Sequence, residues 1–193
     1  MNAPQAIGIG LVGAVRACEW AVRFYVEHGW PLLAMAAVPA LVRALMALRV
    51  RQMLPPGAHE ATEALVAASR AVLMLAIAGI DLLPDTPWWQ SIWPGAWTTE
   101  LSARLSGMTG RGLEWISLCV AVALVVFVLA GLLRSMTQPR LLGWGLSLTG
   151  MRPRAATARA QAIGFTVGNL ITIPLTTLLM YAAVARAPFC LRT

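Results

Sequence analysis

Charged side chains are scarce in this sequence of 193 residues. They make up 12% of the residues, against 59% that are hydrophobic, whereas about a quarter of the residues in an ordinary soluble domain are charged. A chain with so few charges cannot cover the surface of a water-soluble fold of this size. The composition therefore excludes an ordinary soluble domain and indicates an integral membrane protein.

Lysine is absent and acidic residues are few. All fifteen basic side chains are arginine, against eight acidic ones, which gives a formal charge of +7. We interpret the exclusive use of arginine as the codon bias of a GC-rich, bacterial genome. Nucleic-acid modules gather basic and aromatic residues on one face, but here the two types are separate. We therefore expect the arginines to contact anionic lipid headgroups, and we expect no nucleic-acid partner.

Cysteine and histidine are too sparse for a metal or redox centre. Cys18, Cys119 and Cys190 are far apart and odd in number, and we expect them to be small packing residues. His59 lacks the second histidine, at position 63, that an H-E-x-x-H zinc motif requires. No nucleophile and base are paired either. The sequence predicts no catalytic residue, no cofactor and no metal, and a protein that is not an enzyme.

Four apolar stretches are long enough to cross a bilayer, whose core of about 30 Å requires about 20 helical residues. Proline-rich breaks at 54–57 and 84–87 bound the second stretch. The four predicted spans cover residues 30–48, 63–83, 113–133 and 162–185. The predicted fold is an all-α integral membrane protein, one membrane domain over residues 1–193, with about four transmembrane helices and amphipathic interfacial helices.

Residues 5–27 are also apolar, but charged residues recur along them at three- and four-residue spacing. These are Arg16, Glu19, Arg23 and Glu27. Each would cost about 2.5–3.5 kcal/mol near the membrane centre, against about 0.3–0.6 kcal/mol gained per strongly apolar residue. We therefore predict an amphipathic helix in the membrane interface, with a fifth spanning helix as the alternative.

The distribution of arginine predicts the orientation. The connection 134–161 holds five arginines and no acidic residue, so the positive-inside rule places it in the cytoplasm. The 49–62 connection is then also inside, and the 84–112 connection and both termini are outside a bacterial inner membrane. Seven of the eight tryptophans fall on the outer side, as expected of residues that prefer the interface.

Polar groups within the spans are the best functional candidates, because their burial in hydrocarbon is costly. The candidate polar site consists of Arg43, Arg70, Asp81 and Asn169. Arg70 and Asp81 are eleven residues apart, about 16 Å along one helix, and cannot pair with each other. The alternative, which we favour, is that both arginines reach the inner headgroups and Asp81 lies in the outer interface.

One face of the fourth predicted span combines small and hydroxylated residues. They are Gly164, Gly168, Thr172 and Thr176, on the same side as Asn169. Such residues let helices approach closely and hydrogen-bond. We predict that this face packs against another helix, with a solute pathway as the alternative.

Tryptophan is unusually dense in the outer connection. Trp88, Trp89, Trp93 and Trp97 lie within ten residues, either as a docking surface for a partner protein or as an aromatic belt. Residues 98–107 follow as a predicted short amphipathic helix lying flat, with Glu100 and Arg104 paired at four-residue spacing.

These features favour a non-enzymatic scaffold or assembly subunit of a larger membrane complex, such as secretion, conjugation or transport machinery, with other membrane subunits as partners. The alternative is a small-solute or ion transporter or channel that uses the intramembrane arginine and aspartate and the polar fourth span. An enzyme acting on lipid is the least supported class, because no catalytic constellation is visible.

Overall fold

The computed structural model of the chain describes residues 3–47, 57–87, 90, 95, 97–136 and 153–192. The regular structure of these residues is entirely helical, which confirms the predicted all-α class. The helices are α1 (Ala3–Glu27), α2 (Gly29–Ala47), α3 (Ala58–Leu82), α5 (Thr98–Ser106), α6 (Gly112–Met136), α8 (Pro153–Ala185) and α9 (Ala187–Cys190).

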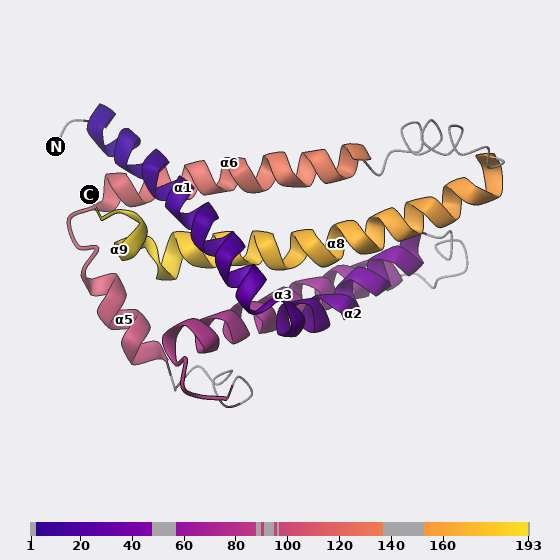
Figure 1. Ribbon diagram of the computed structural model, residues 1–193, viewed down its shortest axis with the longest axis horizontal. Coiled ribbons are helices and arrows are strands. Elements are labelled where there is room, and N and C mark those ends of the chain that lie inside the picture. Colours follow the sequence, from indigo (N-terminus) through magenta and orange to yellow (C-terminus); the bar gives the residue numbers. More distant parts are fainter. Residues whose placement is uncertain are drawn as a thin grey trace.

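The helices form a bundle around α8. Helices α3, α6 and α8 run along its long axis, and α1 crosses it obliquely (Figure 1). Helix α8 packs against α1, α2, α3 and α6. The short helices α5 and α9 and both ends of the chain lie together at one end of the bundle (Figure 1), which we call the α5 end.

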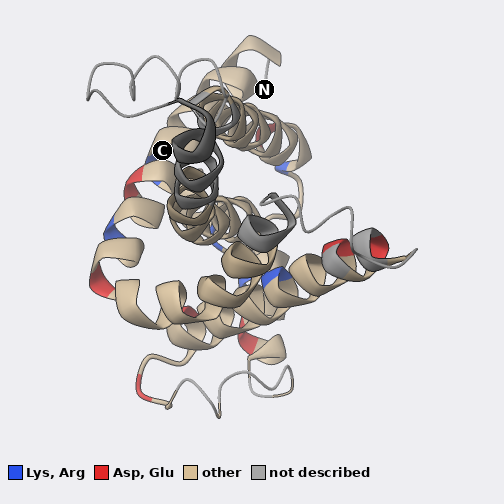
Figure 2. Cartoon of the chain, turned by 90° about the vertical axis from the view of Figure 1, so that its right-hand side faces the viewer, with Lys and Arg blue, Asp and Glu red and all other residues tan. Residues whose placement is uncertain are grey.

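Three helices in the described residues are long and apolar enough to cross a membrane. Their apolar segments are Glu63–Leu82, Gly112–Leu132 and Thr166–Ala185, and most of the described ribbon is uncharged (Figure 2). They correspond to the second, third and fourth predicted spans. The predicted span 30–48 coincides with α2, but its described apolar part, Gly29–Val42, is shorter than a span.

Helix α1 is amphipathic, as its sequence predicts, but the structure makes it part of the bundle. Its four charged residues, at positions 16, 19, 23 and 27, are all exposed. The buried face consists almost entirely of small residues at helical spacing: Ala6, Gly10, Gly13, Ala14, Ala17, Ala21 and Phe24. Small residues let helix backbones approach closely, so α1 packs against α6 and α8. Its place in the membrane interface stays a prediction.

Helices α1 and α6 approach each other closely at Gly10. A Cβ atom built there would lie 2.9 Å from the backbone nitrogen of Leu118 and would also overlap the Ser117 side chain. Ser117 donates a hydrogen bond back to the carbonyl of Ile7, at 3.3 Å. The absence of a side chain at Gly10 therefore sets the distance between the two helices.

Replacement of this glycine is the sharpest test of the α1 contact. We expect Gly10→Ala to lower the free energy of unfolding by about 1–3 kcal/mol, because the extra methyl group overpacks a contact that includes backbone. Denaturation of the purified protein in mixed micelles measures this change.

Gly8→Ala is the matched control on the same helix, since nothing lies within 4 Å of a Cβ built at Gly8. Alanine there should be neutral or should stabilise by up to about 1 kcal/mol through helix propensity. Equal stability of the two variants would show that α1 does not pack as described.

Candidate functional site

The Asp81 carboxylate is the centre of the most concentrated group of polar contacts in the described chain. It lies in the last turn of α3 and its side chain is only 2% exposed. Oδ2 accepts hydrogen bonds from Tyr181 Oη at 2.9 Å and from Arg104 Nη1 at 3.1 Å. Oδ1 accepts from Arg186 Nε at 2.9 Å and Nη2 at 2.5 Å. We call these four residues the Asp81 cluster.

The cluster compensates a charge that is expensive to bury. A carboxylate removed from water loses several kcal/mol of hydration, which is recovered only if charged partners and hydrogen bonds surround it. Here both carboxylate oxygens are bonded, and the two guanidinium groups keep contact with solvent, with side chains 16% and 29% exposed. Arg104 also pairs with the exposed Glu100 at 3.1 Å, so the predicted pair on this helix is present.

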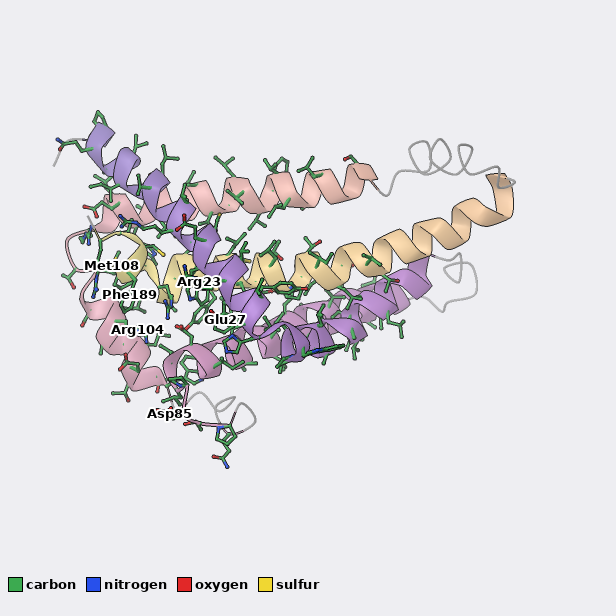
Figure 3. The ribbon with its side chains drawn as sticks, viewed as in Figure 1. Arg23, Glu27, Asp85, Arg104, Met108 and Phe189 are labelled. Atoms are coloured by element: carbon green, nitrogen blue, oxygen red, sulfur yellow. The ribbon has the colours of Figure 1, made fainter. Side chains whose placement is uncertain are left out.

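Aromatic rings surround the guanidinium groups of the cluster. Arg186 lies over the Trp20 ring, with its Cζ 5.0 Å from the ring centroid. Arg104 and Arg186 both lie over Phe189, at 5.3 and 5.5 Å, where α5 meets α9 (Figure 3). Such cation–π contacts add about 0.5–2 kcal/mol each, depending on exposure. Through Trp20 the cluster also reaches α1, so four helices and α9 meet around one carboxylate.

Side chains from other helices also hold the segment that follows α8. Arg111 donates to the carbonyl of Leu191 at 2.6 Å and pairs with the buried Glu114. Arg16 donates from α1 to the carbonyls of Cys190, at 3.3 Å, and Arg192. Carbonyl groups at a helix end have no partner within the helix. The arginines supply those partners and tie the end of α9 and the two residues after it to α1 and to Arg111, which directly precedes α6.

Cys190 takes a packing role. Its side chain is buried, and burial raises the pKa of its thiol to about 11. The thiol therefore stays protonated at neutral pH and is a poor nucleophile.

The structure assembles a different site from the one that the sequence predicted. Asp81 is its centre, but its bonds go to Arg104 of α5, Tyr181 of α8 and Arg186 between α8 and α9, rather than to an arginine of the spans. Arg70 is exposed, eleven residues away on α3, and Asn169 is half-buried on α8. Arg43 belongs to α2, and its side chain lies outside the described ones.

Sequence reasoning missed Arg104, Tyr181, Arg186 and Phe189 as members of this site. One signal was available, because an aspartate within a span requires a cation at the same depth. Asp81 is near the predicted outer end of its span, and Arg104 and Arg186 are arginines that the predicted topology places close to that end. The depth of the charge therefore pointed to these partners.

The small and hydroxylated face of α8 is partly buried. Thr176 is buried, and Gly164, Gly168 and Thr172 are half-buried. The threonine hydroxyls donate within their own helix, from Thr172 to the carbonyl of Gly168 and from Thr176 to that of Thr172 at 2.6 Å. Helix packing stays the prediction for this face. Because their hydroxyls are bonded within α8, these threonines would contribute to packing through their small size rather than through hydrogen bonds to another helix.

The environment of Trp97 differs from the one expected of a residue that contacts a partner protein. Its ring is buried, 9% exposed, and its indole nitrogen has no hydrogen-bond partner in the described part of the chain. It is a core residue rather than an exposed anchor. Trp88, Trp89 and Trp93 lie outside the described residues.

Comparison with known proteins identified no relative of this chain. No family model, no curated protein and no solved structure matches this chain. Its class follows from its own fold, a helical protein with three described helices able to cross a membrane. Within the described residues, no three His, Cys, Asp or Glu side chains gather closely enough to hold a metal ion.

Removal of the central charge tests the structural role of the cluster. We expect Asp81→Asn to lower the free energy of unfolding by about 3 kcal/mol, because two guanidinium groups lose the anion that compensates them. The control is Glu100→Gln, which removes an exposed partner of the same Arg104 and should cost less than about 1 kcal/mol. Denaturant titration of both variants compares them, and equal losses would show that Asp81 does not tie the helices.

Proposed function

We propose that this chain is a non-enzymatic subunit of a larger membrane complex, and that its α6–α8 face binds a transmembrane helix of another subunit. The observation that carries the proposal is an open apolar groove of about 530 Å³. Its lining residues are Met74, Cys119, Val122, Ala123, Val126, Phe127, Ala130, Met180, Ala183 and Val184. All of them lie within the three membrane-capable segments.

Helix α6 is the most apolar of the three segments but the least covered. Only 17% of its span is buried, against 50% for the span of α8. Phe127 is 76% exposed at the groove, and nothing lies within 4 Å of a Cβ built at Gly131. Space for another element therefore remains along α6.

The chemistry of the groove suits a helix. Lipid offers no hydrophobic force between helices, so their association depends on close packing, which small residues permit. Cys119, Ala123 and Ala130 of α6 and Ala183 of α8 supply small side chains to the groove. Phe127 adds a large aromatic surface of the kind that anchors interfaces.

The state of the polar groups supports a subunit over a transporter. A solute pathway requires polar groups that face a shared cavity, but the Asp81 carboxylate is 2% exposed and bonded on both oxygens within the chain. The groove, in contrast, has an almost entirely apolar lining. The Asp81 cluster holds helices together, and the open groove is apolar.

The proposal includes a topology. Helix α2, with 19 residues, has a length of about 28 Å and serves as the fourth span. The arginine-rich connection 134–161 is cytoplasmic, which places the α5 end on the outer side of a bacterial inner membrane.

Filling the groove tests the subunit proposal. In a host that contains the partner subunits, we expect the wild-type chain to purify in mild detergent as a complex heavier than the chain itself. Ala123→Trp should reduce the co-purified partner by about tenfold or more, because a loss of 1.4 kcal/mol of binding is sufficient. Native mass spectrometry measures both masses.

The matched control is Val128→Trp, an exposed position of the same helix outside the groove, which should leave the complex intact. An intact complex in Ala123→Trp would place the partner elsewhere. A wild-type chain that purifies alone and carries solute flux in liposomes would favour the transporter.

Single-cysteine labelling tests the topology in a background without the three native cysteines. Ser102→Cys lies on the exposed part of α5 and Glu60→Cys on the exposed start of α3. A membrane-impermeant maleimide applied to intact cells should modify the first variant and not the second. After lysis both should react, and the reverse pattern in intact cells would invert the orientation.

A further inference from the structure

A second cavity lies at the α5 end, between α1 and the segment that follows α8. Its volume is about 420 Å³. The lining residues are Gln5, Gly8, Ile9, Val12, Arg16, Cys190 and Arg192. None of them belongs to the Asp81 cluster or to the groove of α6 and α8.

The cavity has an apolar wall and a cationic rim. Gly8, Ile9 and Val12 supply the wall from successive turns of α1. Nothing lies within 4 Å of a Cβ built at Gly8, so the missing side chain leaves space there. Arg16 and Arg192 bring two guanidinium groups to the same cavity. Such a cavity suits an amphiphilic ligand, because its wall can contact an apolar chain and its two arginines can bind an anionic group.

Both guanidinium groups retain binding capacity. Arg16 uses one nitrogen, Nη1, for the carbonyls of Cys190 and Arg192, whereas a guanidinium carries five N–H donors. Arg192 lies over the Phe189 ring, with its Cζ 4.7 Å from the centroid. Within the described residues, no carboxylate pairs with either group. The two arginines therefore give the cavity a positive charge that no described acidic side chain neutralises through an ion pair.

The position of the cavity matches the level of lipid headgroups. The spans of α6 and α8 meet this end at Gly112 and Ala185, and Cys190 and Arg192 follow immediately beyond. Both ends of the chain lie here as well (Figure 1). A cavity at this level meets the boundary between headgroups and acyl chains, where arginine binds phosphate and an apolar wall contacts hydrocarbon.

We propose that this cavity binds one anionic phospholipid. The phosphate lies between Arg16 and Arg192, whose planar guanidinium groups suit phosphate oxygens. The start of an acyl chain runs along Gly8, Ile9 and Val12. The site is separate from the groove, so it goes beyond the proposed subunit function and does not depend on it.

The decisive variant is Gly8→Leu, which fills the space beside the wall and keeps both arginines. Native mass spectrometry of the purified full chain, titrated with phosphatidylglycerol or phosphatidylcholine, measures the affinity for one bound lipid. Wild type should prefer phosphatidylglycerol by about tenfold, because phosphatidylcholine carries the same phosphate but adds a quaternary ammonium group that the two guanidinium groups repel. Gly8→Leu should lose that preference, whereas Gly131→Leu, a helical glycine equally open but far from the cavity, should keep it.

Charge variants provide the second arm. Arg192→Gln should weaken phosphatidylglycerol binding by about tenfold and phosphatidylcholine binding less, because the loss of a cation also relieves repulsion of the choline group. Arg23→Gln, an exposed arginine of α1 outside the cavity, should change neither. Inorganic phosphate distinguishes lipid from a free anion, because it should not displace phosphatidylglycerol at equal concentration. Displacement by phosphate alone, or wild-type lipid selectivity in Gly8→Leu, would overturn the proposal.

Discussion

The arrangement of the α5 end depends on the need to compensate one buried carboxylate. Asp81 is removed from water at the end of α3, and an uncompensated charge there would cost more than most other contacts in a marginally stable fold could offset. Its partners come from α5, from α8 and from the junction of α8 and α9, which must therefore lie against the end of α3. Two of those partners also stack on Phe189, so the position of α9 follows from the same charge.

The sequence predicts helices better than it predicts their neighbours. Three of the four predicted spans are membrane-capable helices in the structure, because hydrophobic length is a local property. A charged residue within an apolar stretch can also be recognised locally, and Asp81 was identified as a candidate site residue in this way. The partners of Asp81 are 23 and 105 residues away in Arg104 and Arg186. No periodicity within one helix contains that information.

Two other features show where local reasoning was incomplete. In α1, the stripe of charged residues was visible in the sequence. The opposite stripe of alanine and glycine is only weakly hydrophobic, and its role in packing becomes clear only when a second helix lies against it. The position of Gly10 against Ser117 and Leu118 is a property of the pair of helices. For Trp97, density in sequence does not distinguish a buried ring from an exposed one, and the structure buries it.

The contact between α1 and the segment after α8 has a consequence for biosynthesis. Arg16 binds the carbonyl of Cys190, which the ribosome adds 174 residues later. Helix α1 also packs on α6 and α8, so its small-residue face lacks these partners until α6, and then α8, has been synthesised. The contact between α1 and the segment after α8 therefore forms late, after all the helices that separate them in the sequence have been synthesised.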